Sequence, residues 1–189
     1  AFKPENEIEK PKAYIIPAGW YEVIERLKLN RVIVKDLLKD TLINVHTYHI
    51  DEYKSRPAPY EKHHGNYGVK VSKYEEKIKF LKGDHIIELN QPANRYIIEM
   101  LEPIGDDSFF AWNFFDAVLQ QKEGYSDYRW EDVAGEILKK DTALKTKLEA
   151  KISGDPEFAR NSNAILNYIY KNSVYYEKAH MRYPVYRVE

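Results

Sequence analysis

Short apolar runs and one amphipathic stretch alternate near the start of the chain. Residues 13–16 are uniformly apolar and end at Pro17, which is typical of a buried strand. Residues 32–34 form a second, β-branched run. Between the two runs, apolar side chains recur at the spacing of one helix face, at Trp20, Val23, Ile24 and Leu27. The pattern predicts a compact strand–helix–strand unit whose two strands pair in parallel through a right-handed crossover.

The next part of the chain is rich in β-prone residues. Residues 42–53 partly alternate between apolar and polar side chains, and the proline-rich segment 55–59 ends this run because proline cannot donate to a sheet ladder. Residues 77–81 carry lysines between their apolar positions, as expected of a strand with one solvated face. The turn at 82–84 predicts a hairpin between residues 77–81 and 85–89. We therefore expect a mainly antiparallel sheet in this region.

The second half of the chain has helical periodicity. Helices are predicted over residues 94–101, 108–119, 130–138, 144–152 and 156–172. Asp141 and Asp155 are expected to cap the last two helices, and Pro156 favours the first turn of a helix. Residues 183–188, which include two tyrosines, are expected to add an edge strand.

These elements together predict an α+β protein. It would contain the N-terminal strand–helix–strand unit, a central and mainly antiparallel sheet, and C-terminal helices. The 189 residues suffice for one sizeable core or for two small ones. We expect residues 1–10 to be a polar lead-in and residues 11–189 to form a single domain. In this domain, residues 11–90 would be mainly sheet with one helix, and residues 91–189 would be mainly helical.

Composition narrows the classes of function. The chain has 29 basic and 30 acidic side chains, so it lacks the concentrated positive charge typical of nucleic-acid binding. It has no cysteine, which excludes disulfides, thiolate zinc sites and cysteine nucleophiles. No apolar run approaches the ~20 residues needed to cross a bilayer, so no membrane span is expected. The 16 tyrosines suit half-buried surfaces and interfaces, because each has an apolar ring and a polar hydroxyl.

One stretch, from His85 to Glu88, has the His-x-x-Glu spacing of the metal-binding pair in zinc carboxypeptidases. A zinc site needs both side chains to converge on one ion at about 2 Å. In a strand, however, a separation of three residues sends the two side chains to opposite faces. We therefore predict no catalytic residue, no metal ligand and no cofactor in this chain. An independent metal enzyme that uses His85, Glu88 and a further histidine is the alternative.

The candidate binding or interface residues are Gln91, Asn94, Arg95 and Trp112. The first three lie in a loop between a predicted strand and a predicted helix, where they bring amide and guanidinium donors together. The structural alternative is that Asn94 caps the helix and that Arg95 pairs with Asp106 or Asp107. Trp112 lies in an aromatic run and is a candidate for an interface.

Five segments follow one another along the chain: PKAYIIP at 11–17, WYEVIERL at 20–27, NQPANR at 90–95, DSFFAWNFFD at 107–116 and HMRYPVY at 180–186. In this order they resemble a region that follows the peptidase domain in bacterial carboxypeptidase A-like zinc proteins. The resemblance extends from Pro11 to the end of the chain, and none of the segments is the metal motif of that family.

The resemblance implies a non-catalytic accessory domain. Its partner would be an upstream peptidase domain of the same polypeptide, which it would stabilise or whose substrate cleft it would shape. The resemblance also implies that the peptidase domain holds zinc, that the parent protein acts on a peptide or cell-wall substrate, and that it is periplasmic or secreted. The alternative function is a module that binds peptidoglycan or another glycan, with exposed tyrosines as stacking platforms.

Overall fold

The computed structural model describes residues 7–121 and 124–189, which separate into two compact units. The first unit comprises residues 7–120 and 179–189, and the second comprises the described part of residues 121–178. Each unit has its own apolar core, as separately packed domains do. These two units lie within residues 11–189, for which the sequence predicts a single domain, and the helices of the second unit bury their apolar faces against one another.

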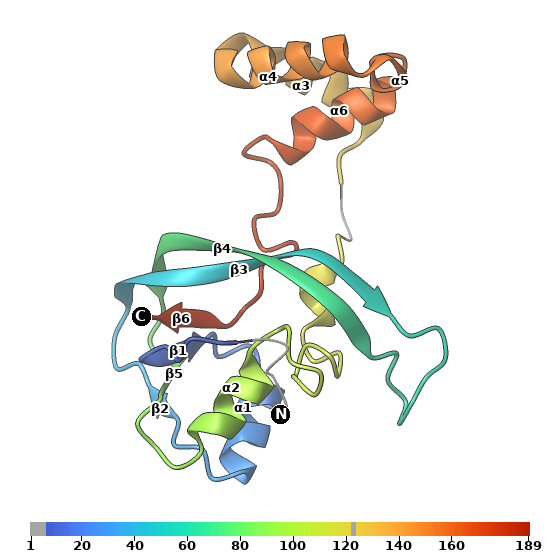
Figure 1. The fold of residues 1–189 in the computed structure, drawn as a ribbon. Coiled ribbons are helices and arrows are strands. Elements are labelled where there is room, and N and C mark those ends of the chain that lie inside the picture. The colour runs from blue at the N-terminus through green and yellow to red at the C-terminus, as the bar shows by residue number, and fades with distance from the viewer. Residues whose placement is uncertain (1–6, 122–123) are drawn as a thin grey trace. The chain divides into compact units, whose positions relative to one another are not determined.

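The first unit is built on an antiparallel sheet, and the protein has the predicted α+β fold (Figure 1). Among the described residues, six strands form this sheet in the order β2-β5-β1-β6-β3-β4. Their bounds are Ala13–Ile16 (β1), Lys35–Asp36 (β2), Thr41–Ser55 (β3), Asn66–Phe80 (β4), His85–Glu88 (β5) and Tyr186–Val188 (β6). The 15-residue strands β3 and β4 form a long hairpin, so the loop at 56–65 lies well beyond the shorter strands (Figure 1).

The strand pairing differs from the predicted pairing in two places. The predicted parallel pair of β1 with residues 32–34 is wrong, because β5 lies between β1 and β2 and is antiparallel to both. The predicted hairpin of residues 77–81 with 85–89 is also wrong, because β4 pairs along its length with β3. The turn at Gly83, whose φ is +93°, instead leads the chain from the β3–β4 hairpin to β5.

The C-terminal strand β6 occupies the interior of the sheet, whereas the sequence predicts an edge strand. It pairs with β1, where Arg187 lies opposite Tyr14, and it meets β3, where Arg187 lies opposite His46. β6 therefore joins the short strands β2, β5 and β1 to the long hairpin.

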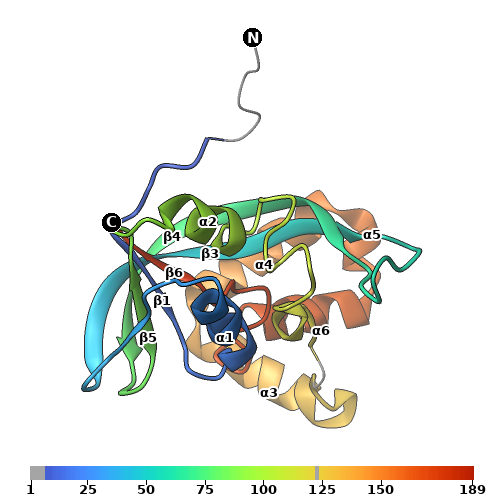
Figure 2. The ribbon, with the colours of Figure 1, turned by 90° about the horizontal axis from the view of Figure 1, so that it is seen from below.

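Two helices pack on one face of the short strands (Figure 2). They are α1, Tyr21–Leu29, and α2, Asn94–Leu101, close to the predicted bounds. Leu27 of α1 and Ile97 of α2 are fully buried and share a core cluster with Tyr14 of β1. The apolar residues that recur at helical spacing in the sequence therefore form the face that each helix packs against the sheet.

The aromatic segment 108–119 does not form the predicted helix. It makes successive turns and ends in the short 3-10 helix η1, Asp116–Leu119. Asn113 has a φ of +65°, which is incompatible with an α-helix. Phe110 and Phe115 both contact the ring of Tyr183, at centroid distances of 6.0 and 5.0 Å. Burial of apolar rings on several sides of the segment, and not helix propensity, determines its path.

The second unit consists of helices. They are α3, Asp127–Lys140, α4, Thr142–Gly154, α5, Pro156–Ala159, and α6, Ser162–Lys171. Asp141 and Asp155 cap α4 and α5 as predicted, each accepting a backbone N–H hydrogen bond of 2.9 Å. The single helix predicted over residues 156–172 is wrong, because Asn161 caps a new helix by accepting a hydrogen bond of 3.0 Å. Trp130 is 4% exposed and lies in the core of this unit.

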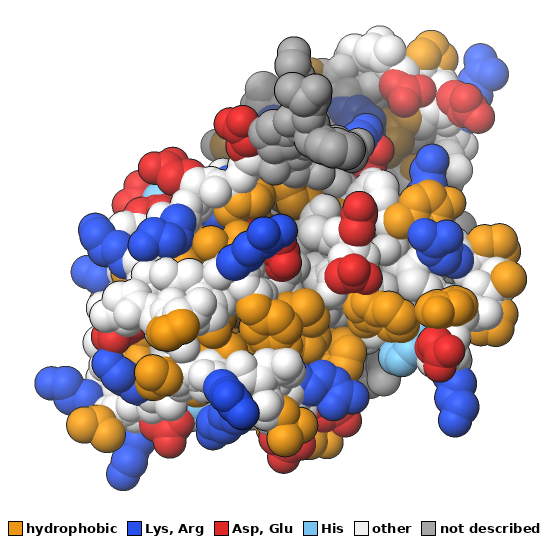
Figure 3. All heavy atoms as spheres, turned by 60° about the horizontal axis from the view of Figure 1, so that its bottom comes forward, with side chains coloured by type: hydrophobic (Ala, Val, Ile, Leu, Met, Phe, Trp, Pro, Cys, Tyr) orange, Lys and Arg blue, Asp and Glu red, His pale blue; other side chains and the backbone are white. Residues whose placement is uncertain are grey.

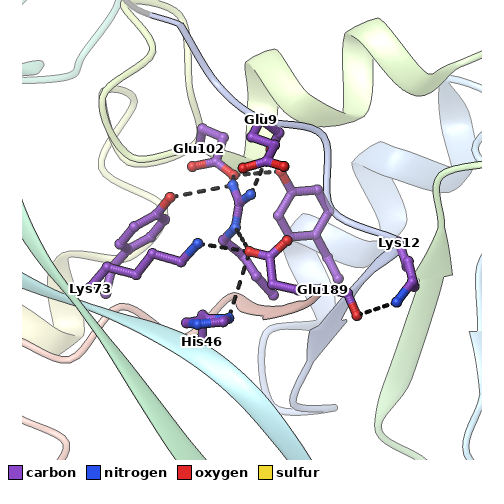
Figure 4. Close-up of polar contacts among 9 residues, drawn as sticks. Glu9, Lys12, His46, Lys73, Glu102 and Glu189 are labelled. Carbon is purple, nitrogen blue, oxygen red and sulfur yellow. Dashed lines mark hydrogen bonds and ion pairs between the residues drawn. The ribbon is translucent and has the colours of Figure 1, made fainter.

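A buried ion pair joins β6 to the end of α2 (Figure 4). Arg187 and Glu102 are each 2% exposed, and Arg187 Nη1 donates to Glu102 Oε1. Tyr14 donates its hydroxyl to the same oxygen at 2.5 Å. The other nitrogens of Arg187 donate to Glu189 Oε1 at 3.0 Å and to the carbonyl of Glu9 at 2.6 Å. One guanidinium thus ties together segments from the beginning, the middle and the end of the chain.

Neighbouring side chains complete this network. Lys73 and His46 point toward Glu189, with nitrogen–oxygen distances of 2.8 and 3.7 Å (Figure 4). Burial and the Glu102 carboxylate raise the pKa of the Tyr14 hydroxyl, and the same two causes raise the pKa of Tyr48. Both hydroxyls therefore stay protonated at neutral pH: that of Tyr14 donates to Glu102, and that of Tyr48 accepts a hydrogen bond of 3.3 Å from Arg187 Nη1.

Replacing Arg187 with Met should lower the free energy of unfolding by about 3–5 kcal/mol, because it leaves the Glu102 carboxylate buried without its partner. Adding Glu102→Leu to Arg187→Met removes this stranded charge, so the double variant should be more stable than the single one. Urea unfolding of the three proteins at pH 7 measures both differences. A double variant that is less stable than Arg187→Met would contradict the role given to the pair.

Candidate functional site

Three of the four predicted binding residues hold the protein's own backbone or side chains. Gln91 is 8% exposed, and its amide binds the backbone of Ile33 at 2.7 Å and the end of β5 at 2.8 Å. Asn94 accepts a hydrogen bond from the N–H of Gln91 at 3.1 Å. Arg95 forms an ion pair of 2.9 Å with Glu99 instead of the expected aspartates. The loop residues thus have partners within the protein, but not those of the structural alternative: Ala93 is the N-cap of α2, without a side-chain cap hydrogen bond, and Arg95 pairs with Glu99. Gln91 also borders a hollow of about 190 Å³.

His85 and Glu88 lie on the strand β5, and each binds a side chain of β2. His85 Nδ1 is 2.7 Å from Asp36 Oδ1, and Lys35 Nζ is 2.6 Å from Glu88 Oε2. The two side chains of the His-x-x-Glu stretch thus have separate partners. Over the described parts of the chain, no group of three or more His, Cys, Asp and Glu side chains is arranged to hold a metal ion.

Trp112, the fourth predicted residue, lines a cavity of about 820 Å³ in the first unit. One wall of the cavity is the loop between β3 and β4, and the other is the segment 104–112, which follows α2. Ligand pockets typically have volumes of about 300–1,000 Å³, so this cavity has the size of a ligand site. The side chains that line it include Arg56, Tyr60, His63, Asp106, Asp107 and Trp112. Aromatic and charged groups therefore face the same space.

The loop at the end of the β3–β4 hairpin contains a strained turn. Tyr60 and His63 exchange two backbone hydrogen bonds, of 2.9 and 2.8 Å. Between them, Glu61 and Lys62 have φ angles of 48° and 69°. Two positive φ angles define a type I′ turn, which favours Asn-Gly, and left-handed backbone costs other residues about 1–2 kcal/mol each. Such strain persists where the surrounding structure holds the chain, and it is frequent in functional loops.

The strained turn places aromatic rings beside Trp112. The ring centroids of Tyr60 and His63 lie 6.3 and 5.5 Å from that of Trp112. Tyr60 is 67% exposed, so much of its ring is open to solvent. The guanidinium of Arg56 lies 5.6 Å from the ring centroid of Tyr67 on the same hairpin. The cavity thus has an aromatic wall with a cation next to it.

Three polar side chains fasten the two walls together. Asn66 Nδ2 donates to Asp116 Oδ1 at 2.9 Å, and Asn113 Nδ2 donates to Asp116 Oδ2 at 3.0 Å. The N–H of Asn66 also donates to the carbonyl of Ala111 at 2.9 Å. Burial raises the pKa of the Asp116 carboxyl, whereas the two amide hydrogen bonds and the nearby His63 oppose this rise. The segment that carries Trp112 is therefore attached to the first residue of β4.

Two glycines allow the walls of the cavity to pack closely. A Cβ atom on Gly65 would lie 3.3 Å from the carbonyl oxygen of Ala111 in the opposite wall. A Cβ atom on Gly105 would lie 2.8 Å from the carbonyl oxygen of Glu99, which is closer than van der Waals contact allows. Side chains at these positions would push the segments apart, so the shape of the cavity depends on both glycines.

Sequence reasoning missed most of this cavity. The residues at 56–65 and at 104–107 carry no local pattern that joins them, because the two segments meet only after the sheet has formed. The sequence analysis considers Asp106 and Asp107 only as partners of Arg95, and His63 lies in the polar loop between the two long strands. A signal for Tyr60 was its place next to the Pro57–Pro59 segment that interrupts the strand pattern.

Comparison of the chain with protein-family models, with curated proteins and with solved structures finds no match. Within the described ranges, no helix has both the length and the apolar character needed to cross a membrane. The properties of the cavity are therefore the basis for a functional proposal.

The stability of the protein should depend on pH through Asp116. The pKa of this carboxyl is higher in the folded than in the unfolded protein, where it is near the ordinary value of 3.8. At pH values just above 3.8, the folded state therefore binds more protons than the unfolded state. The stability contributed by the protonated carboxyl is lost as the pH rises through the raised pKa. The free energy of unfolding, minus that of the Asp116→Asn variant, should therefore fall as the pH rises above the ordinary Asp pKa. Paired urea titrations measure this difference, and a rise with pH would contradict the assignment.

Proposed function

We propose that the protein is a glycan-binding module and that the cavity beside Trp112 holds the saccharide. The observation that carries the proposal is the aromatic wall. The faces of pyranose rings present C–H groups that pack on aromatic rings, while their hydroxyls require hydrogen-bonding partners. Trp112 and Tyr60 supply aromatic surface, and the carboxylates of Asp106 and Asp107 supply acceptors in the same cavity.

This proposal makes the glycan hypothesis from the sequence more specific. That hypothesis assigns stacking to exposed tyrosines in general, and some of them, such as Tyr21 and Tyr74, lie outside the cavity. The proposed platform is a tyrosine beside the strained turn and a tryptophan in the segment that Asn66 fastens to β4. Rings that are already held in place lose little conformational entropy when a ligand binds. Peptidoglycan is one candidate glycan, as in the glycan hypothesis from the sequence.

The Trp112→Ala variant should bind chitotetraose, a neutral tetramer of N-acetylglucosamine, about tenfold more weakly than the unaltered chain, since the lost stacking surface is worth roughly 1.4 kcal/mol. Tyr21→Ala is the matched control, because Tyr21 is 61% exposed and lies outside the cavity. Isothermal titration calorimetry on the full chain measures the three affinities, and circular dichroism checks that the variants are folded. Equal affinity of the Trp112→Ala variant and the unaltered chain would refute the site.

A second candidate function is that of an accessory domain that packs on a zinc carboxypeptidase-like peptidase domain. Exposed apolar side chains favour it: Leu29, Ile33 and Leu38 are 79%, 59% and 87% exposed. Figure 3 also shows apolar side chains gathered among charged ones on one face of the molecule, and such surfaces often bind a partner. Joining the chain to a peptidase domain encoded upstream of it would then raise its thermal unfolding midpoint, and an unchanged midpoint would count against this function.

A further inference from the structure

One wall of the cavity carries the cation Arg56. Over the residues that the structure describes, Arg56 makes no ion pair, although its guanidinium is held 5.6 Å from the ring centroid of Tyr67. Its backbone N–H donates to the carbonyl of Gly65 at 3.1 Å, and its carbonyl binds His64 Nδ1 at 2.9 Å. The backbone and the ring thus fix the position of Arg56. Its guanidinium donates to none of the described residues, and its five N–H groups suit a planar anion such as a carboxylate.

Two anions on the other wall are also unpaired. Asp106 and Asp107 are exposed, and neither takes part in an ion pair with any described residue. They occupy the middle of a turn closed by a hydrogen bond of 3.1 Å from Ser108 N to the carbonyl of Gly105. Since Gly105 packs against the end of α2, this turn is held at the cavity and presents both carboxylates there.

We propose that the saccharide bound in this cavity is zwitterionic, with an amine that pairs with Asp106 and Asp107 and a carboxylate that pairs with Arg56. The inference rests on the proposed glycan-binding function and names the class of glycan. A saccharide that carries a short peptide with a free amino group and a free carboxylate has this chemistry. Its sugar ring packs on Trp112, while the opposite charges of the two walls set its orientation.

The test compares a charged conjugate with forms that lack one kind of charge, and with a neutral saccharide. The probes are N-acetylmuramyl-L-alanyl-D-glutamyl-L-lysine, its Nε-acetylated form, its amidated form without free carboxylates, and neutral chitotetraose. Each is titrated by calorimetry into the full chain and into three variants: Asp106→Asn combined with Asp107→Asn, Arg56→Gln, and Glu22→Gln. Glu22 lies on α1 outside the cavity, so the last variant controls for the loss of a surface charge.

We expect the unaltered chain to bind the lysine tripeptide conjugate about fivefold or more tightly than the acetylated and amidated forms at low salt, as partly desolvated ion pairs allow. In the double aspartate variant the conjugate and its acetylated form should bind equally. In Arg56→Gln the conjugate and its amidated form should bind equally. Glu22→Gln should keep every preference and the chitotetraose affinity of the unaltered chain.

Two different failures are distinguishable. If the unaltered chain binds the charged and neutralised conjugates equally, or if its preference survives both cavity variants, the zwitterionic ligand is refuted while Trp112-dependent chitotetraose binding still supports a glycan module. If no saccharide binds in a manner that depends on Trp112, the proposed function itself is refuted, and the present inference with it.

Discussion

The guanidinium of Arg187 lies in the interior of the first unit and forms an ion pair with the Glu102 carboxylate. The Glu189 side chain and the backbone carbonyl of Glu9 accept hydrogen bonds from its other N–H groups. Burying an unpaired ion of this kind costs several kcal/mol, so the segments that neutralise it must be in place together. Arg187 belongs to β6, which lies between β1 and the long hairpin. The position of β6 in the sheet and the pairing of this charge therefore depend on each other.

The same ion pair positions the candidate site. Glu102 ends α2 and begins the segment that carries Asp106, Asp107 and Trp112. At the other end of this segment, the carboxylate of Asp116 accepts a hydrogen bond from the side chain of Asn66, the first residue of β4. The segment is thus attached to β6 at one end and to the hairpin at the other, and it holds Trp112 beside the strained turn without being a regular helix or strand.

Local patterns predicted much of the secondary structure but little of the pairing. The amphipathic spacing of α1 and the capping carboxylates Asp141 and Asp155 act within a few residues, and these predictions are confirmed. The position of β6 and the insertion of β5 between β1 and β2 depend on contacts between distant segments, which local periodicity does not record. The cavity is missed for the same reason. Trp112 is conspicuous as a tryptophan, but its neighbours in the cavity come from the loop between β3 and β4, far from it in the sequence.

Binding at Trp112 is tested most directly by the indole N–H signals in ¹H–¹⁵N spectra of the full chain during a chitotetraose titration. Three tryptophans report on three environments: Trp112 lines the cavity, Trp20 packs against Phe115 in the first unit, and Trp130 donates to the carbonyl of Leu166 at 3.1 Å in the second. The proposed site predicts that the Trp112 signal moves with saturation while those of Trp20 and Trp130 stay in place. A Trp112 signal that does not move at saturating saccharide would contradict it.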